Sequence, residues 1–524
     1  AGAEEHGAAQ GLAPGAAAAA AALGGAVTSG LVRAVAEALA ECLAASAQGG
    51  GFLASPEAAV TCVSLAVALD CATAGSPLAA EALLVENLAS PLVPHLVAGL
   101  GLVGDPAAME AATPGAGGGV PPPTAALEPL LAVVTRVANG PRSFLERGSG
   151  DLRGVSKVAA APRKTLNAVY KPCARYEKLL DDFTQLLVSS GAVDALASLF
   201  ALCDRPKEQS VEPVPPAILA GLRLLESLIE SGGSVSGGVS EGQGSLIVAL
   251  RATALAGLPS LLTSVLLQTE NETRAPVLAD PILAASRLPA NFVPVATVTM
   301  RLLNNIHAVF GPREVQSVLS SSDLRVETHH LLSVCLAICC GEWDRAPKES
   351  EERRDGKDDG VHDAVVSSVD EEKTSSSSSR WTLEQIASLL DETLLFIGAF
   401  ALLCPANQDM LRWGRFPTLA QRLPDLPFPY YADVKKKAAL FPTLVAVAFR
   451  HDTNKAAIAR DLSLETLRAF IAKEMEEDVS ETSETSQTKQ SSSARLAGLP
   501  SRFDFANRFP RELWSDAALY FASD

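Results

Sequence analysis

The side chains best suited to bind a ligand lie in one corner of the sequence, Arg-Trp-Gly-Arg-Phe at 412–416. Arginine pairs with phosphate, and an aromatic ring stacks on a nucleic-acid base or on another guanidinium. Three lysines follow at 435–437, where positive charge is slightly unfavourable if it begins a helix, so a role in binding is favoured. The candidates for contact with RNA or a partner protein are Arg412, Trp413, Arg415, Lys435, Lys436 and Lys437. The structural alternative is that Trp413 and Phe416 form the core of a helix corner and that the lysines are a solvated helix start.

A second basic segment, 142–178, contrasts with the rest of the chain, whose formal net charge is −17. This acidic total argues against a chain coated with nucleic acid, but a local basic face can still meet phosphate, and the tyrosines in the segment can stack on bases. The alternative is a solvated insertion, since charge runs are common on protein surfaces. The candidates in this segment are Arg163, Lys164, Lys171 and Arg175.

Residue patterns typical of catalysis are not found in the sequence. Glycine loops that bind dinucleotides or phosphate are absent, and no nucleophile elbow follows a strand pattern. His329 and His330 with Cys335, Cys339 and Cys340 are possible metal ligands, but all lie in one apolar helical stretch. A structural zinc site instead uses two short-spaced pairs separated by a loop. We predict a non-enzymatic protein without metal or cofactor. The scattered cysteines predict a reducing compartment.

The elements that must position the candidate residues are predicted to be helical. Apolar residues from Leu383 to Ala401 recur at three- and four-residue steps, which indicates one face of a helix. Asn454 repeats the place of Asn407 after 47 residues, within the about 40–47 residues of armadillo and HEAT repeats. A glycine corner also recurs, because Gln precedes Gly by six residues at 185–191 and at 408–414, with a weaker copy at 316–322. We predict an all-α chain, a degenerate armadillo/HEAT-like helical solenoid with disordered insertions.

Changes in composition suggest the borders of its parts. The expected parts are a disordered Ala/Gly leader at 1–25, N-terminal helices at 26–103, a Gly/Pro linker at 104–123, a helical-repeat region with insertions at 124–343, a disordered charged and serine-rich linker at 344–380, C-terminal helical repeats at 381–473, a disordered segment at 474–495 and a terminal aromatic helix at 503–521. We expect the aromatic helix to dock back as a cap, with a partner-binding motif as the alternative.

The N-terminal helices are expected to bury the apolar residues that recur at helical spacing. These are Leu31, Val35, Leu39 and Leu43 in the first helix, and Val60, Val63, Val67 and Cys71 in the second. No charge-free apolar window reaches the about 18 residues of a membrane span, so none is predicted. Because the chain begins with Ala, we expect it to be part of a longer protein.

Three blocks resemble the C-terminal region of the family of the S phase cyclin A-associated protein in the endoplasmic reticulum (SCAPER). They lie at 183–196, 301–307 and 393–444. The most particular part is Leu-Pro-Phe-Pro-Tyr-Tyr at 426–431 followed by Phe-Pro-Thr-Leu at 441–444. Order and spacing agree over roughly residues 125–471, with insertions.

The resemblance implies an all-helical adaptor, cytoplasmic and associated with the endoplasmic reticulum. It implies a role in tubulin autoregulation, in which the protein joins ribosomes that translate tubulin together with a tetratricopeptide-repeat factor. A deadenylase complex is then recruited and destroys the mRNA. The basic residues at 412–415 become candidate contacts to ribosomal RNA. The alternative is a cyclin A-binding cell-cycle scaffold whose binding motif lies in a disordered insertion such as 344–380.

Overall fold

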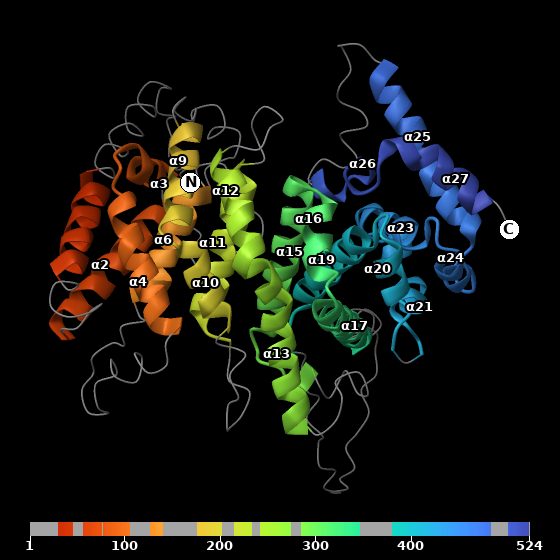
Figure 1. Cartoon of the computed structure of the whole chain (residues 1–524), viewed down its shortest axis with the longest axis horizontal. Helices are drawn as coiled ribbons and strands as arrows, with labels where there is room; N and C mark the ends of the chain where they lie inside the picture. The colour runs from red at the N-terminus through yellow and green to blue at the C-terminus, as the bar shows by residue number, and fades with distance from the viewer. Residues whose placement is uncertain are drawn as a thin grey trace, which may run out of the picture. The chain divides into compact units, whose positions relative to one another are not determined.

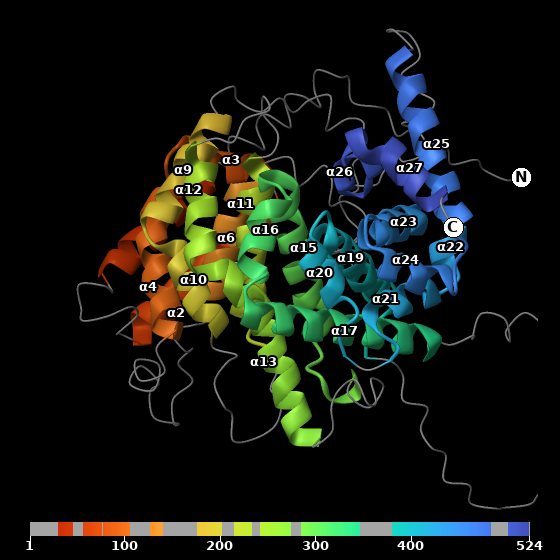
Figure 2. The same ribbon diagram turned by 45° about the vertical axis from the view of Figure 1, so that its right-hand side comes forward.

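The structure is a computed structural model that describes residues 30–45, 56–75, 77–104, 126–139, 176–201, 214–232, 241–273, 285–345, 380–414, 416–483 and 501–522. Within these ranges every regular element is a helix, which confirms the all-α prediction (Figure 1, Figure 2). Two compact units are present: unit 1 takes Ala1–Leu202 with Pro216–Ala254, and unit 2 takes Cys203–Pro215 with Leu255–Asp524. The leader at 1–25 and almost all of the linkers predicted at 104–123 and 344–380 lie outside the described residues.

Unit 1 is built from pairs of packed helices. α6 (Leu127–Asn139) packs against α11 (Pro216–Gly232), and α9 (Tyr176–Ser189) packs against α12 (Glu241–Ala249). The other elements are a helix at 30–45, α2 (Pro56–Gly75), α3 (Pro77–Val85), η1 (Ser90–Leu92), α4 (Val93–Gly104), α10 (Ala192–Phe200) and η4 (Leu250–Ala254). Since α2 packs on α6 and α4 on α10, the N-terminal helices share a unit with part of the region predicted at 124–343.

The first N-terminal helix buries Leu39 and Leu43 as predicted, whereas α2 buries a different face from the predicted one. Leu31, Val60 and Val67 are 60%, 46% and 44% exposed. The buried stripes are Val32, Ala36, Leu39 and Leu43 in the first helix, and Cys62, Ala66, Leu69 and Thr73 in α2. Small Ala and Cys side chains let two helices approach closely, so the better-packed face is the one with fewer large residues. In these alanine-rich helices both faces are apolar, so periodicity alone does not identify every buried residue.

One helix in the described part of the chain, Gly244–Thr269, is long and apolar enough to cross a membrane, and two bent helix pairs would raise the number of candidate spans to three. No membrane span was predicted from the sequence, and Gly244–Thr269 has the length and composition of one. Residues 252–269 carry no charged side chain, but Thr, Ser and Gln residues interrupt their apolar run. Half of the apolar window is buried inside the structure. A helix that packs within a soluble fold would bury a similar part of its apolar surface.

In unit 2 a long helix followed by a short one occurs three times. The long helices are α15 (Phe292–Phe310), α19 (Leu383–Ala401) and α23 (Val434–Ala448), and the short ones are α16 (Pro312–Leu319), α20 (Pro405–Met410) and α24 (Asp452–Ala459). α15 packs on α19, and α19 packs on α23. The remaining helices are α13 (Leu255–Thr273), α17 (Ser322–Arg345), α21 (Leu419–Arg422), η5 (Leu423–Asp425), α22 (Pro429–Ala432) and α25 (Leu464–Ser483), with the C-terminal elements described below.

The 47-residue correspondence between Asn407 and Asn454 has a common physical role. Asn407 Nδ2 donates to Phe400 O at 2.9 Å, and Asn454 Nδ2 donates to Val447 O at 3.0 Å. Each asparagine is fully buried and reaches seven residues back to the end of the preceding long helix. The last carbonyls of a helix have no partner within it, so a buried amide there satisfies groups that water cannot reach.

Two of the three predicted corner glutamines extend this pattern to the next long helix. Gln316 Nε2 donates to Leu402 O at 2.9 Å, and Gln408 Nε2 donates to Phe449 O at 3.0 Å. Gln185, the third, is exposed. The two corner glycines, Gly191 and Gly414, both have the left-handed backbone expected of them, with φ of +78° and +87°.

The C-terminal segment docks on unit 2, as expected, but as four short elements instead of one helix. These are η6 (Ser501–Phe503), α26 (Phe505–Arg508), η7 (Arg511–Leu513) and α27 (Trp514–Ala522). α26 contacts α23, and α27 packs along α25. The Phe505 ring lies between partners, 4.8 Å from the centroid of Trp514 and 5.2 Å from that of Phe470. This aromatic cluster supplies the contact area that anchors the segment.

Helix α25 continues to Ser483, into the segment predicted at 474–495 to be disordered. The sequence there is rich in Glu and Ser, so its helix is explained by tertiary contact. Arg511 from η7 forms an ion pair with Asp478 at 2.6 Å, and α27 packs along the helix. Residues 484–495 lie outside the described part of the chain.

A buried carboxyl on the same part of α25 predicts a pH dependence of stability. Burial raises the pKa of Glu474 to about 7, and the nearby Glu477 and Asp504 raise it while Lys473 lowers it. A carboxyl whose folded pKa exceeds its unfolded value stabilises the fold fully below its unfolded pKa, and this contribution is lost as pH rises through the folded value. Because the side chain is partly exposed, screening limits the effect to about 1 kcal/mol.

We therefore expect Glu474→Gln to raise the melting temperature of unit 2 at pH 8 and to leave it nearly unchanged at pH 5. Thermal unfolding followed by tryptophan fluorescence across this range measures the difference. Glu465→Gln is the matched control, since Glu465 is 67% exposed on the same helix. Parallel pH curves for the wild-type chain and Glu474→Gln would contradict the prediction.

Candidate functional site

The predicted corner is a turn between α20 and α21, built around a glycine that no other residue replaces easily. Trp413 N donates to Met410 O at 2.9 Å, and Gly414 then takes a φ of +87°. A Cβ atom on Gly414 would lie 3.3 Å from Cε1 of His329 on α17. The turn thus requires glycine for its left-handed backbone and for its close approach to α17.

Trp413 lies with one side against α17 and the other towards solvent. Its ring centroid is 6.1 Å from that of His329, and 40% of the residue is exposed. Burial lowers the pKa of His329, which keeps that imidazole uncharged at neutral pH. The indole is tilted by 52° to the His329 ring and is partly exposed, so its open surface is available to a second ring. Phe416 is 72% exposed, so the alternative in which these two rings form the core of the corner is wrong.

A hollow of about 470 Å³ opens beside the tryptophan. Its lining residues are Arg325, Ala406, Asp409, Arg412 and Trp413. Arg325 reaches the hollow from α17, where its Nη2 donates to Ser320 O at 2.6 Å. Its Nε atom is buried and has no hydrogen-bond partner among the described residues. Arg325 therefore brings a second guanidinium group, besides that of Arg412, to the lining of the hollow.

The charges around the hollow favour an anionic ligand. Arg412 lies 3.6 Å from Asp409, and the Asp409 carboxylate also contacts His451 Nε2 at 3.1 Å. Asp409 is 59% exposed, so its pairing with Arg412 is weak and leaves that guanidinium able to meet another anion. Two guanidinium groups and one carboxylate give the lining a net positive charge. Sequence reasoning missed Arg325, because it lies on a different helix and nothing in its local pattern distinguishes it.

A second aromatic and cationic pair lies on the same turn and the end of α24. The guanidinium carbon of Arg460 lies 5.9 Å from the ring centroid of Phe416. This pair exposes a flat ring and a positive charge, the two groups that bind bases and phosphates. Arg460 was not among the predicted candidates.

The three predicted lysines have different environments. Lys436 Nζ forms an ion pair with Asp391 at 2.6 Å and lies 5.2 Å from the Tyr430 ring, so it is engaged inside the fold. Lys435 is exposed, and Lys437 is half-buried. The unfavourable placement of positive charge at the start of α23 is offset by Asp433, whose carboxylate accepts from Lys435 N and Lys436 N. Only Lys435 keeps the open position that the binding hypothesis requires.

The other candidates lie outside the described residues. These are Arg415, Arg163, Lys164, Lys171 and Arg175. Among the side chains that the structure does describe, no group of three or more His, Cys, Asp or Glu residues is arranged to hold a metal ion. Cys335 and Cys339 are buried in α17, and burial raises the pKa of the Cys335 thiol to about 12.

The block Phe-Pro-Thr-Leu at 441–444 has a structural role that its sequence does not reveal. Pro442 lies inside α23 and has no N–H, so the carbonyl of Ala438 loses its helical donor. Arg508, from the C-terminal segment, supplies the missing hydrogen bond to Ala438 O at 2.5 Å. It also donates to Ala439 O at 2.9 Å and to Thr443 Oγ1 at 2.6 Å. The carbonyl that Pro442 leaves without a helical donor is therefore satisfied by one buried arginine.

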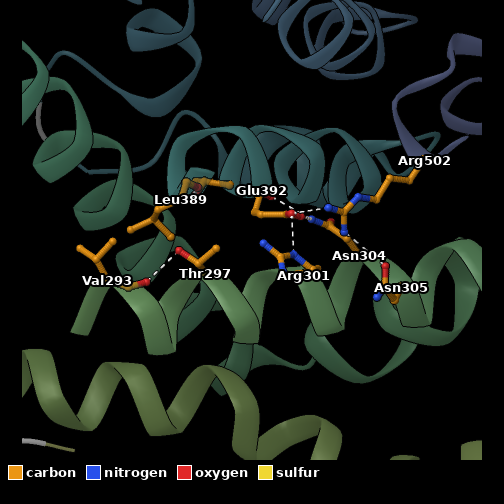
Figure 3. A network of polar contacts seen from close by, with 9 residues as sticks. Val293, Thr297, Arg301, Asn304, Asn305, Leu389, Glu392 and Arg502 are labelled. Carbon is orange, nitrogen blue, oxygen red and sulfur yellow. Dashed lines mark hydrogen bonds and ion pairs between the residues drawn. The ribbon is translucent and has the colours of Figure 1, made fainter. Parts of the chain in front are cut away.

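The polar residues of the 301–307 block hold a buried carboxylate, as Figure 3 shows. Glu392 on α19 is 2% exposed. It accepts from Arg301 Nε at 3.0 Å, from Asn304 Nδ2 at 3.0 Å and from Arg502 Nη2 at 2.6 Å. Arg502 belongs to the C-terminal segment, so one carboxylate joins α15, α19 and that segment.

The block at 426–431 also forms hydrogen bonds inside unit 2. Tyr430 is fully buried, and its hydroxyl donates to Asp391 Oδ1 at 2.7 Å. The Tyr431 hydroxyl donates to Pro424 O at 2.6 Å. Most of the residues that carry the resemblance thus maintain the fold, whereas the open cationic and aromatic groups lie on the turn at 411–418 and its neighbours.

Comparison with known proteins shows a distant similarity to a human protein. No protein-family profile matches the chain. The chain is 23% identical over 355 residues to the human S phase cyclin A-associated protein in the endoplasmic reticulum. The match covers 66% of this chain and 21% of that protein, so the chain spans about a fifth of the length of this relative. The two proteins are distantly related.

Proposed function

We propose that this chain is a non-enzymatic adaptor, a degenerate armadillo/HEAT-like helical solenoid that binds translating ribosomes through the hollow between α17 and α20. The single observation that supports this is an open tryptophan beside two arginines, one of which has a buried unsatisfied nitrogen. Stacking on a base and pairing with its phosphate together fit an exposed nucleotide of ribosomal RNA. Phe416 and Arg460 would extend the same contact, and Lys435 is a separate exposed candidate.

The resemblance to the SCAPER family suggests the process in which this adaptor acts. We propose that it acts in tubulin autoregulation, together with a tetratricopeptide-repeat factor, and that it recruits a deadenylase complex to the tubulin mRNA. It would work in the cytoplasm and at the endoplasmic reticulum. Purifying the tagged full-length protein should recover ribosomal proteins and deadenylase subunits together.

Cosedimentation of the full chain with ribosomes at increasing salt tests the proposed contact. Arg412→Gln is expected to weaken binding about tenfold and to reduce the slope of log K against log[salt] by about 0.7–0.9, because one phosphate contact no longer releases a counterion. Trp413→Ala is expected to weaken binding about tenfold without changing the slope, since stacking is worth about 1–3 kcal/mol per base.

The control is Arg468→Gln, which removes an exposed arginine from α25 of the same unit, with 50% of its side chain exposed against 41% for Arg412. It should leave both affinity and slope unchanged. Binding that does not respond to salt, or an equal loss in all three variants, would overturn the proposed RNA contact.

A second candidate function is suggested by the human relative, which is named for its association with cyclin A. In this alternative the chain is a cell-cycle scaffold that binds cyclin A through a short motif in the serine-rich linker. Replacing 346–379 by a Gly/Ser linker of equal length keeps Arg380, whose Nη1 donates to Leu288 O at 2.6 Å. Loss of cyclin A binding in this variant would support the alternative, and unchanged binding would exclude the motif.

A further inference from the structure

Two cysteines that are 20 positions apart in the sequence meet in unit 1. Cys42 Sγ lies 2.9 Å from Cys62 Sγ, only about 0.9 Å longer than the about 2.05 Å of an S–S bond. Neither cysteine is in a disulfide. We propose that Cys42 and Cys62 form a reversible redox site, which a hydroperoxide closes into an intramolecular disulfide between helix 30–45 and α2.

The packing of the two helices holds the thiols in this position. Cys62 belongs to the buried stripe of α2, one turn before Ala66, and Cys42 precedes the buried Leu43. The small side chains of Ala36 and Ala66 on the facing stripes allow the close approach. Because the thiols are already together in the folded chain, closing the bond requires little rearrangement of either helix.

The two thiols differ in their access to solvent, and this sets the order of the chemistry. Cys62 is fully buried, and burial raises the pKa of its thiol to about 12. Cys42 is half-buried. A hydroperoxide therefore meets Cys42 first, since oxidation follows the exposure of a thiol and its thiolate character.

The proposed reaction is balanced by one equivalent of hydroperoxide. The Cys42 thiolate attacks the terminal oxygen of the hydroperoxide, whose O–O bond breaks, and a sulfenic acid forms while an alcohol or water leaves. Cys62 Sγ then attacks the Cys42 sulfur, and the expelled hydroxide takes the Cys62 proton and leaves as water. A dithiol reductant reverses the bond by thiol–disulfide exchange.

The test is oxidation of the full-length chain with a stoichiometric amount of hydrogen peroxide, followed by digestion without reductant and mass spectrometry. We expect a peptide that links Cys42 to Cys62, which disappears after treatment with dithiothreitol. Cys71→Ser should keep the linked peptide, since Cys71 is exposed on the same helix and lies outside the pair. Cys42→Ser and Cys62→Ser should each lose it.

Limited proteolysis gives a second measurement on the wild-type chain, so the test does not depend on how well the cysteine variants fold. The disulfide closes a loop, and its formation should slow cleavage between helix 30–45 and α2 at least threefold. The proposal is overturned if both thiols remain open to alkylation after Cys71 has been oxidised, or if the linked peptides all contain Cys71. Neither measurement depends on ribosome binding.

Discussion

Replacing Arg508 by methionine is expected to lower the free energy of unfolding of unit 2 by about 3–5 kcal/mol, because buried acceptors that lose their donor cost about 1–3 kcal/mol each. Arg508 is buried and satisfies the carbonyls of Ala438 and Ala439 and the hydroxyl of Thr443. Burial lowers the pKa of its guanidinium to about 9, which shows how strongly the site removes it from water. Methionine keeps the apolar stem and removes the hydrogen-bond donors together with their charge.

Chemical denaturation followed by tryptophan fluorescence measures this effect, since Trp343, Trp381, Trp413 and Trp514 all lie in unit 2. Arg511→Met is the control on the same segment. Its side chain is 54% exposed, so the loss of its ion pair should cost less than about 1 kcal/mol.

A double-mutant cycle tests whether the loss of stability in Arg508→Met comes from the hydrogen bond that Pro442 removes from α23. Pro442→Ala restores an N–H that can bond the Ala438 carbonyl, so Arg508→Met should cost at least about 1 kcal/mol less in that background. If the two substitutions are additive, the carbonyl freed by Pro442 is not what Arg508 satisfies, and its role must be explained by packing alone.

The second large effect is expected at Glu392. Glu392→Ala should lower the free energy of unfolding of unit 2 by about 3–5 kcal/mol, the usual cost of breaking a buried ion pair from one side. The substitution leaves Arg502, which is only 17% exposed, without its carboxylate, and it removes the ion pair of Arg301 (Figure 3). Denaturation followed by fluorescence measures the change.

Two further variants separate charge from geometry at this position. Glu392→Gln keeps an acceptor of similar shape and should lose less stability than Glu392→Ala. The triple variant with methionine at 301, 392 and 502 should recover most of the loss, because apolar residues of similar volume often replace a buried charge cluster without cost. Glu465→Ala on the exposed surface should cost less than about 1 kcal/mol. An equally small effect of Glu392→Ala would show that the arginines find water or other acceptors.

Local sequence signals predicted much of the helical pattern in unit 2. Apolar steps of three and four residues located α19, and the recurrence of asparagine after 47 residues marked two positions with the same hydrogen bond to the preceding helix. The glycines at 191 and 414 were identified because only glycine enters the left-handed region at low cost. These features depend on residues close in sequence, and therefore they can be read without the fold.

Features that depend on contacts between distant segments were missed or misassigned. Arg325 completes the hollow from a helix that precedes Arg412 by 87 positions. Lys436 looked available for RNA until Asp391, from α19, was found beside it. The end of α25 looked disordered, because its own sequence lacks an apolar stripe and its stability comes from α27.

The sequence by itself determined that the chain is helical and where two of its corners turn, whereas the exposure of Trp413 and Phe416 was decided by the tertiary structure. The tertiary structure decided which face of each alanine-rich helix is buried and which charged residues are consumed inside the fold. It also decided that Arg508 donates to the carbonyl that Pro442 leaves without a helical donor. Hydrophobic periodicity is a local property of one helix, whereas close packing and the satisfaction of buried polar groups are settled only when helices meet.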